Sequence, residues 1–319
     1  LHYPLRRQRQ MCIRDRYKAV FFDWDGTAVL SRKAPVEEIV GAMRPLLDQK
    51  VNLVIVSGTT IENIAGGKLE TYFTKEQLAQ LYLGLGRGAF KYRYENGQEL
   101  IFSDMLPDKK MLGDIHRICF DIHMKLLEKY GLNTDIVFSR PNYCKIDLMV
   151  ENQRGDNLFM QENELDMLKD CLEKHGVEGG LQGLLDISVA AGEQYGITVK
   201  PTCDAKYLEV GISSKSDNLD RILEHLQEAY GICPEECCFW GDEYVGIEEG
   251  IYGSDSFMKT KKTGNGDFFD VSEVPGKRPE GVTKLGGGVE RFLGFLREQV
   301  KIAVSYTHLR AHETEADLV

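Results

Sequence analysis

The sequence predicts an α/β protein whose doubly wound, mostly parallel sheet is interrupted by a smaller α+β insert. Short, continuous apolar runs alternate with amphipathic helices in the first and last thirds of the chain, which is typical of parallel strands that helices cover on both faces. Between about residues 105 and 204 this alternation gives way to a long helix and paired short strands. The length of 319 residues also suits about two domains.

The domain boundaries follow from these changes of pattern. Both ends of the chain are typical of translated adapter sequence: the first 16 residues hold five arginines in an acidic protein, and the last 15 show no helical or strand period. We leave both ends out of the fold. The expected segments are a leader over residues 1–16, the first part of the larger domain over 17–104, the insert over 105–204, the second part of the larger domain over 205–304, and a tail over 305–319.

The first part of the larger domain begins with a strand, a helix and two more strands. The helix is predicted over residues 35–48, where apolar side chains recur every three or four positions. Pro35 suits its first turn, whereas Pro45 predicts a kink or break. The strands are continuous apolar runs, at residues 19–23, 52–56 and 81–85.

The pattern changes after Gly88. The dipeptide Asn96-Gly97 lies between extended runs and predicts a hairpin turn. One long helix follows over about residues 108–130, with apolar side chains along one face. The other insert elements are strands at 135–139, 145–150, 184–190 and 195–200 and a helix near 162–175; the larger domain resumes with a strand at 206–210, a helix at 215–230, a strand at 237–242 and a helix at 288–299.

Composition excludes several classes of protein. The formal net charge of −11 argues against a nucleic-acid partner. No apolar run approaches the ~20 residues of a membrane span, so we expect no membrane partner. The eight cysteines lack the density and spacing of a disulfide scaffold, which favours a reducing, cytoplasmic location.

The stretch VFFDWDGT, residues 20–27, ends a buried strand on two carboxylates. Alternation along an extended chain points Asp23 and Asp25 the same way, with Trp24 opposed and packed in the core. Two converging carboxylates repel each other, so a cation must lie beside them or one must hold a proton. This arrangement indicates a functional site at the end of the first strand.

Three further polar stretches fall at predicted strand ends or helix starts. Each is common by itself, because a strand often ends in a short polar turn and a lysine at a helix start is usually solvated. In an open parallel sheet, however, the carboxyl edge of the strands is where ligands bind. The three stretches are Ser57-Gly58-Thr59, Lys215, and Gly241-Asp242-Glu243.

Together with the first motif, these stretches resemble the haloacid dehalogenase superfamily over about residues 17–300. The position of the insert, between the Ser57 strand and Lys215, resembles the type II caps of that superfamily. The stretch KYLEVGISSKSDNLDRIL resembles the Cof-like type IIB subgroup of sugar phosphatases and phosphomannomutases. The resemblance implies a Rossmann-like core, an inserted cap and phosphatase chemistry.

The resemblance also implies roles for single residues. Asp23 would be the nucleophile that forms an aspartyl-phosphate, and Asp25 the general acid and base. Ser57 and Gly58 would bind the phosphate oxygens, with Ser57 at a helix N-terminus. Lys215 would offset the charge on the phosphoryl oxygens and on Asp23.

A magnesium ion is the cofactor that the resemblance implies. Its ligands would be Asp23, Asp242 and the main-chain carbonyl of Asp25. Keeping Asp23 ionised next to Asp25 requires such a cation.

The metal loop departs from the pattern of many relatives. Those carry a further aspartate four residues after the first, where this chain has Gly246. We expect Glu243 in the second acidic role, with Glu248 as a weaker candidate. The departure affects the shell of the metal and leaves the reaction class unchanged.

Residues of the insert would select the substrate as the cap closes and expels water. Arg140, Asn142 and Lys145 gather hydrogen-bond donors beside an apolar strand. Arg140 or Lys145 would contact a substrate hydroxyl or a second anionic group; a solvated hairpin is the equally weighted alternative. Arg87, at the expected hinge between Gly86 and Gly88, is either a phosphate contact or an ordinary surface arginine.

These observations predict a Mg²⁺-dependent phosphomonoester hydrolase that acts on a small phosphorylated metabolite, with a sugar phosphate as the first expectation. The first alternative is a sugar phosphomutase with the same aspartate pair. The second is a catalytically silent sugar-phosphate-binding regulator, against which the intact set of Asp23, Asp25, Lys215 and Asp242 argues. Neither the identity of the sugar nor the oligomeric state follows from the sequence.

Overall fold

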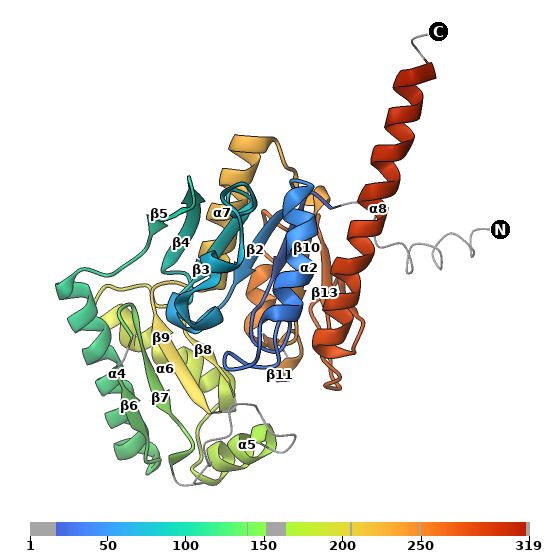
Figure 1. Cartoon of the computed structure of the whole chain (residues 1–319). Helices are drawn as coiled ribbons and strands as arrows, with labels where there is room; N and C mark the ends of the chain where they lie inside the picture. The colour runs from blue at the N-terminus through green and yellow to red at the C-terminus, as the bar shows by residue number, and fades with distance from the viewer. Residues whose placement is uncertain (1–16, 139, 151–163, 205, 249, 317–319) are drawn as a thin grey trace.

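The computed structural model describes residues 17–138, 140–150, 164–204, 206–248 and 250–316. Two units are visible in Figure 1, a larger one around an eight-stranded sheet and a smaller one around a four-stranded sheet. Among the described residues, no helix is both long and apolar enough to cross a membrane.

The larger sheet has β1 (Ala19–Phe22) near its centre, between β10 (Cys237–Gly241) and β2 (Asn52–Val56). The pairing of β1 is parallel on both sides, with Phe22 opposite Trp240 and Ile55. The sheet is parallel except for a hairpin at one edge, which confirms the predicted fold class. The remaining strands are β3 (Leu81–Leu85), β4 (Phe90–Glu95), β5 (Gln98–Asp104), β13 (Asp267–Asp270) and β14 (Val282–Lys284).

Helices cover both faces of this sheet, as Figure 1 shows. Val20 and Phe22 pack in one cluster with α2 (Glu37–Asp48) and α8 (Gly288–Ala316). Phe21 packs in the other cluster with α7 (Lys215–Tyr230). The continuous apolar strands of the sequence therefore reflect burial on both sides.

Two expectations about helices need correction. The helix predicted over 35–48 begins at Glu37 and runs through Pro45 without a break. Buried residues on both sides of Pro45, such as Met43 and Leu46, hold the helix against the sheet and offset the lost hydrogen bond. The tail after residue 304 also continues α8 to Ala316, in a stretch rich in the strong helix formers Ala, Leu, Arg and Glu. Residues 1–16 lie outside the described residues.

The smaller unit has its own sheet and core. Its strand order is β6 (Asp135–Val137), β7 (Tyr143–Asp147), β9 (Tyr207–Gly211) and β8 (Thr202–Cys203), all antiparallel. A separate apolar cluster lies between this sheet and its helices. The helices are α4 (Lys109–Tyr130), α5 (Glu164–Lys174) and α6 (Gly180–Gln194).

Three strand assignments of the sequence analysis differ from the structure. Residues 184–190 lie in α6, where Leu181, Leu184 and Ser188 are buried at helical spacing. Residues 195–200, expected as a strand, form a turn and an irregular segment. The strand at Tyr207–Gly211, expected in the larger domain, pairs with β7 in the smaller sheet, so the smaller unit reaches past residue 204.

The loop after β10 carries a further small element. A two-stranded hairpin of β11 (Gly246–Glu248) and β12 (Ile251–Tyr252) follows it. The short helix η6 (Ser254–Met258) comes next and returns the chain to the end of β10.

Candidate active site

The first strand ends where it meets the loop after β10. The Asp23 amide donates to the carbonyl of Trp240 at 3.0 Å, and the Thr27 hydroxyl donates to Asp242 Oδ1 at 2.8 Å. Gly26, with φ +82°, passes so close that a Cβ there would lie 2.1 Å from Asp242 Oδ2. Only glycine fits this turn, which explains why glycine follows the two aspartates. The fully buried Trp24 packs in the core on the other side, as predicted.

Lys215 supplies the positive charge that the first motif requires. It is the first residue of α7, and its Nζ donates to Asp23 Oδ1 at 3.0 Å. The same Nζ donates to Asp255 Oδ1 at 2.8 Å. All three side chains are buried. The structure thus brings Lys215 and Asp242 to the sheet edge where Asp23 lies.

Asp255 belongs to this cluster and was missed by the sequence analysis. It lies on η6 and is fully buried, and its Oδ2 accepts hydrogen bonds from the amides of Asp242 at 3.0 Å and Glu243 at 2.8 Å. The β11–β12 hairpin separates it from Asp242, so the fixed spacing of four residues led to Gly246 instead. The polar stretch Gly-Ser-Asp-Ser, residues 253–256, directly before the apolar Phe257 and Met258 was the available signal.

Carboxylate oxygens of Asp23, Asp242 and Asp255 lie within 4.8 Å of one another. Glu243, expected in the second acidic role, is exposed and accepts a hydrogen bond from Ser254 Oγ at 2.6 Å. Glu248 is exposed on β11 and lies near Gly180 of the smaller unit. Asp255, and not Glu243, completes the three-carboxylate cluster, while Glu243 lines the same cavity and its outer acidic role stays a prediction.

The electrostatics of this cluster call for another cation. Burial raises the pKa of Asp23 to about 8; Lys215 opposes this effect, and the charges of Asp255 and Glu243 add to it. Burial also raises the pKa of Asp242 well above its ordinary range, and the nearby acidic charges raise it further. Burial alone would lower the pKa of Lys215, but Asp23 and Asp255 bring it well above its ordinary value.

Three carboxylates and one ammonium leave a formal charge of −2 in a buried space. A hard divalent cation with oxygen ligands fits this charge and this donor set. The residues present therefore fit the metal that the sequence analysis expected.

Asp25 lies on the same side of the strand end as Asp23, and both side chains line one cavity. Its Oδ2 forms an ion pair with Arg32 at 3.1 Å, a partner that the sequence analysis did not foresee. Its Oδ1 is buried and has no hydrogen-bond partner among the described residues.

Ser57 and Gly58 end β2 and also line this cavity. The expected helix N-terminus at Ser57 is wrong, because the chain continues in three short 3₁₀ turns rather than in an α-helix. Gly66 and Gly67 take positive φ values there and interrupt any longer helix. In this described segment, no α-helix dipole therefore points at Ser57.

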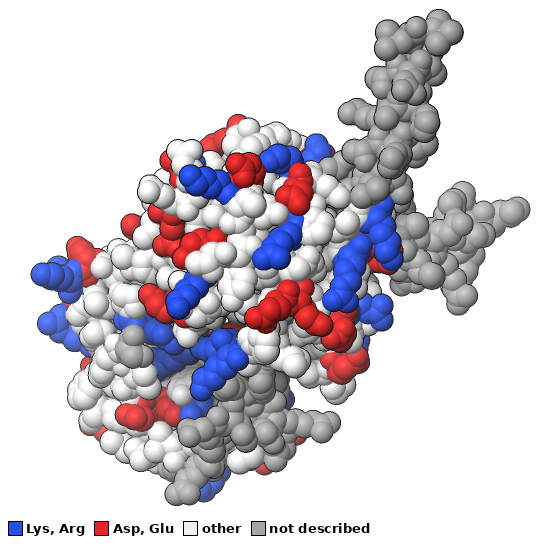
Figure 2. Space-filling view, viewed as in Figure 1, with Lys and Arg blue, Asp and Glu red and all other residues white. Residues whose placement is uncertain are grey.

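The cavity has a volume of about 370 Å³ and lies between the two units. Arg140 and Lys145 line its wall on the smaller unit, and Lys145 forms an ion pair with Glu209 at 2.6 Å. Asn142 does not line it: its side chain is 1% exposed and donates to the carbonyl of Gly86 at 2.9 Å. Figure 2 shows basic and acidic side chains close together along the groove between the units.

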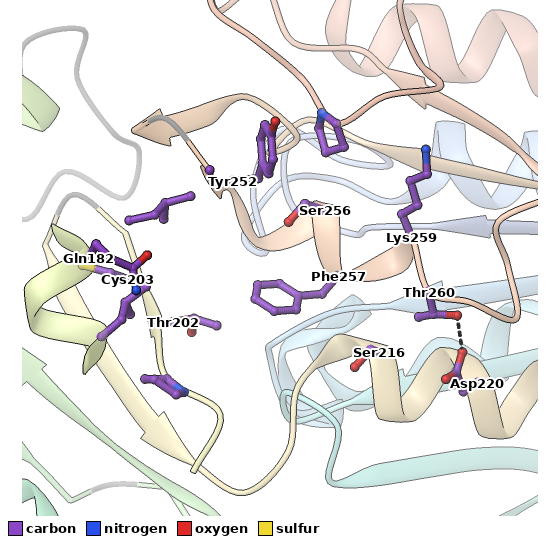
Figure 3. Close-up of a pocket in the computed structure, with 15 residues that line it drawn as sticks. Gln182, Thr202, Cys203, Ser216, Asp220, Tyr252, Ser256, Phe257, Lys259 and Thr260 are labelled. Carbon is purple, nitrogen blue, oxygen red and sulfur yellow. Dashed lines mark hydrogen bonds between the residues drawn. The ribbon is translucent and has the colours of Figure 1, made fainter. Parts of the chain in front are cut away.

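A second cavity, of about 580 Å³, adjoins the first (Figure 3). Thr202 and Cys203 of the smaller unit and Tyr252 and Phe257 of the larger one line both cavities. In Figure 3, Phe257 points from the larger unit toward Thr202. None of the residues that the sequence analysis assigned to the site is among the described residues that line the second cavity.

The fold of this chain is similar to that of known proteins. No family model and no curated protein matches the chain. Among solved structures, an IMP-bound IMP-nucleotidase from Plasmodium falciparum superposes with a TM-score of 0.55 and 14% identity, over 92% of this chain and 70% of that chain. A trehalose-6-phosphate phosphatase from Aspergillus fumigatus superposes with a TM-score of 0.53 and 15% identity, over 89% of this chain and 93% of that chain.

This chain therefore shares its fold with an IMP-nucleotidase and a trehalose-6-phosphate phosphatase. The fold that the sequence motifs predicted is therefore confirmed. At this level of identity the likeness shows the fold alone, and the chemistry depends on the residues of the site.

Proposed function

We propose that this protein is a Mg²⁺-dependent phosphoric monoester hydrolase of the haloacid dehalogenase type, acting on a small phosphorylated metabolite in the cytoplasm. The observation that carries the proposal is the contact of Lys215 Nζ with both Asp23 and Asp255, at the wall of a cavity that also exposes Asp25. A buried nucleophile, a cation beside it and a second carboxylate on the same side are the parts that phosphoryl transfer through an aspartate requires.

The first half-reaction transfers the phosphoryl group to Asp23. A carboxylate oxygen of Asp23 forms a bond to phosphorus while the bond from phosphorus to the substrate oxygen breaks. Asp25 gives its proton to that leaving oxygen. Ser57 and the amide of Gly58 bind the phosphoryl oxygens from the neighbouring strand end, and Lys215 offsets their charge.

The second half-reaction reverses these roles. Asp25 takes a proton from a water molecule, whose oxygen bonds to phosphorus as the bond to Asp23 breaks. Arg32 forms an ion pair with Asp25 Oδ2 at 3.1 Å and lines the same cavity, so it orients this carboxyl group. Inorganic phosphate then leaves and Asp23 is free again.

The metal would be held by Asp23, Asp242 and the main-chain carbonyl of Asp25, with Asp255 beside them. When bound, Mg²⁺ offsets the carboxylate charge and the negative charge on the phosphoryl oxygens.

The wall of the smaller unit would select the substrate. Arg140, Lys145 and Glu209 present polar groups to the cavity, which suits the hydroxyl groups of a sugar phosphate. The two neighbours act, by their names, on IMP and on trehalose 6-phosphate. A substrate screen should therefore hold nucleoside monophosphates as well as sugar phosphates.

Phosphate release from such a panel, with and without Mg²⁺, tests the proposal. We expect turnover that excess chelator abolishes, and Asp23→Asn should lower kcat by about 10⁴-fold or more because the nucleophile is lost. Asp186→Asn, at an exposed aspartate of α6, is the matched control. Equal activity of Asp23→Asn and the unmodified protein would refute the mechanism.

The same assay separates the alternatives. A phosphomutase would need a sugar bisphosphate activator and would return the phosphoryl group to a sugar instead of releasing it. A silent regulator would bind a sugar phosphate and release no phosphate from any member of the panel.

A further inference from the structure

The turn between β3 and β4 has an unusual backbone. Three consecutive residues take left-handed conformations: Gly86 at φ +64°, Arg87 at φ +55° and Gly88 at φ +96°. This region is unfavourable for a side chain as large as that of arginine. Arg87 is nevertheless only 4% exposed, so it is not an ordinary surface arginine, and it lines the same cavity as Asp23 and Asp25. A strained, buried arginine of this kind calls for a functional explanation.

The Arg87 guanidinium spans the boundary between the two units. Arg87 belongs to the larger unit, and its NH2 group donates to the smaller unit: to the carbonyl of Lys200 at 2.5 Å and to Thr202 Oγ1 at 3.0 Å. Its Nε lies 3.1 Å from Glu209 Oε2. NH1 donates to the carbonyl of Ser213 at 2.6 Å. These contacts engage four of the five N–H groups of the side chain, so most of its donors hold the two units together.

The same turn touches the segment that presents Lys215. The Ser213 hydroxyl donates to the carbonyl of Arg87 at 3.0 Å. Gly88 lies against Ser214, since a Cβ at Gly88 would be 2.3 Å from the Ser214 carbonyl oxygen. Ser214 is the N-cap of α7, and Lys215 is the first residue of that helix. A displacement of the turn would therefore reach Lys215 directly.

Two more contacts come from the smaller unit. The Asn142 amide donates to the carbonyl of Gly86 at 2.9 Å. The chain leaving β9 runs beside the guanidinium, because a Cβ at Gly211 would lie 3.2 Å from Arg87 NH1. The turn is thus held on one side by the smaller unit and on the other by the start of α7.

We propose that Arg87 is a positioning residue that couples the docking of the smaller unit to the position of Lys215. Its contacts with Ser213 and Ser214 fix the start of α7 and thereby the ammonium group of Lys215, which must reach both Asp23 and Asp255. A misplacement of about 1 Å in a reacting group can cost about a hundredfold in rate. The inference rests on the proposed function only in giving Lys215 its catalytic role.

Arg87→Met tests the coupling, because methionine keeps much of the length and loses every donor. Arg87→Lys keeps the charge and loses the planar fork. Two readouts are needed: steady-state hydrolysis of p-nitrophenyl phosphate, and the rate at which an amine-acylating reagent labels Lys215, followed by peptide mass spectrometry. The control is Arg44→Met, which removes an exposed arginine that also donates twice to a backbone carbonyl, that of Tyr72.

We expect Arg87→Met to lower kcat by about tenfold to a hundredfold with a smaller change in KM. Labelling of Lys215 should be faster by about tenfold or more, because the buried ammonium loses its fixed environment. Arg87→Lys should shift both readouts in the same direction, and Arg44→Met should shift neither. A folded Arg87→Met protein with unchanged kcat and unchanged labelling would overturn the proposal.

Two further outcomes are an unfolded Arg87→Met variant and an unmodified protein without phosphatase activity, and each has its own second measurement. If circular dichroism shows that Arg87→Met is unfolded, Ser213→Ala removes one link of the same chain and should raise labelling of Lys215 by a smaller factor; no change would count against the coupling. If the unmodified protein releases no phosphate, the proposed function fails, while the labelling comparison still tests the coupling.

Discussion

Asp255 organises the site from a distance along the chain. One carboxylate oxygen holds Lys215 Nζ, and the other accepts the amides of Asp242 and Glu243. Hydrogen bonds to a charged group are roughly twice as strong as neutral ones, and the Asp255 side chain that accepts these three is fully buried. A single side chain therefore fixes the ammonium and the loop that presents Asp242.

Asp255→Asn should disable the site while leaving the fold. The side-chain amide of asparagine has one oxygen and one NH₂ group. Its NH₂ group would face either Lys215 Nζ or the two backbone N–H groups, which are all donors, so one of these two sets of hydrogen bonds is lost. We expect kcat for an aryl phosphate to fall by about 10²–10³-fold at saturating Mg²⁺. Circular dichroism checks the fold, and Asp186→Asn again serves as the matched control; a wild-type rate for Asp255→Asn would show that this carboxylate is dispensable.

At the scale of elements, the sequence predicts local features well. Helix α7 has the bounds that the sequence predicted, because Ser214 caps its start and Gly231, at φ +64°, ends it. Asp23 and Asp242 could be placed together because parallel strands bring their carboxyl ends to one edge. The misses depend on long-range pairing: β9 joins the smaller sheet through β7, and the β11–β12 hairpin moves Asp255 away from its expected position. No local pattern encodes the pairing of β9 with β7, and the polar turn before Phe257 is the one local signal for Asp255.

Strand β4 carries a buried lysine whose titration affects stability. Lys91 Nζ donates to the carbonyl of Gly88 at 2.8 Å, and burial lowers its pKa to about 8, although Asp217 and Asp104 oppose the effect. Because the pKa is lower in the folded protein than in the unfolded chain, the contribution of Lys91 to stability is present above pH 10.5 and is lost as the pH falls through about 8.

Lys91→Met removes this dependence. The free energy of unfolding of the variant, relative to that of the unmodified protein, should therefore increase by about 1–2 kcal/mol between pH 10 and pH 7, after allowance for solvent screening. Urea unfolding at both pH values measures this difference. A difference that is independent of pH would show that Lys91 titrates normally.

At the scale of the whole molecule, the two units divide the work. Each has its own apolar core, and the cavity of about 370 Å³ lies between them. The larger unit supplies the carboxylates and Lys215, while the smaller unit supplies the wall with Arg140 and Lys145. Under the proposed function, the smaller unit would select the substrate and the larger unit would carry out the chemistry, and Arg87 contacts both units.

The central claim is that a phosphoryl group is transferred to Asp23, and trapping the intermediate tests it most directly. The enzyme is quenched during turnover of its best substrate and treated with borohydride, which reduces an aspartyl-phosphate to homoserine, and its peptides are analysed by mass spectrometry. We predict homoserine at position 23 in samples with substrate and Mg²⁺ and none when chelator is present. Reduction at another carboxylate, or rapid phosphate release with position 23 never modified, would contradict the account.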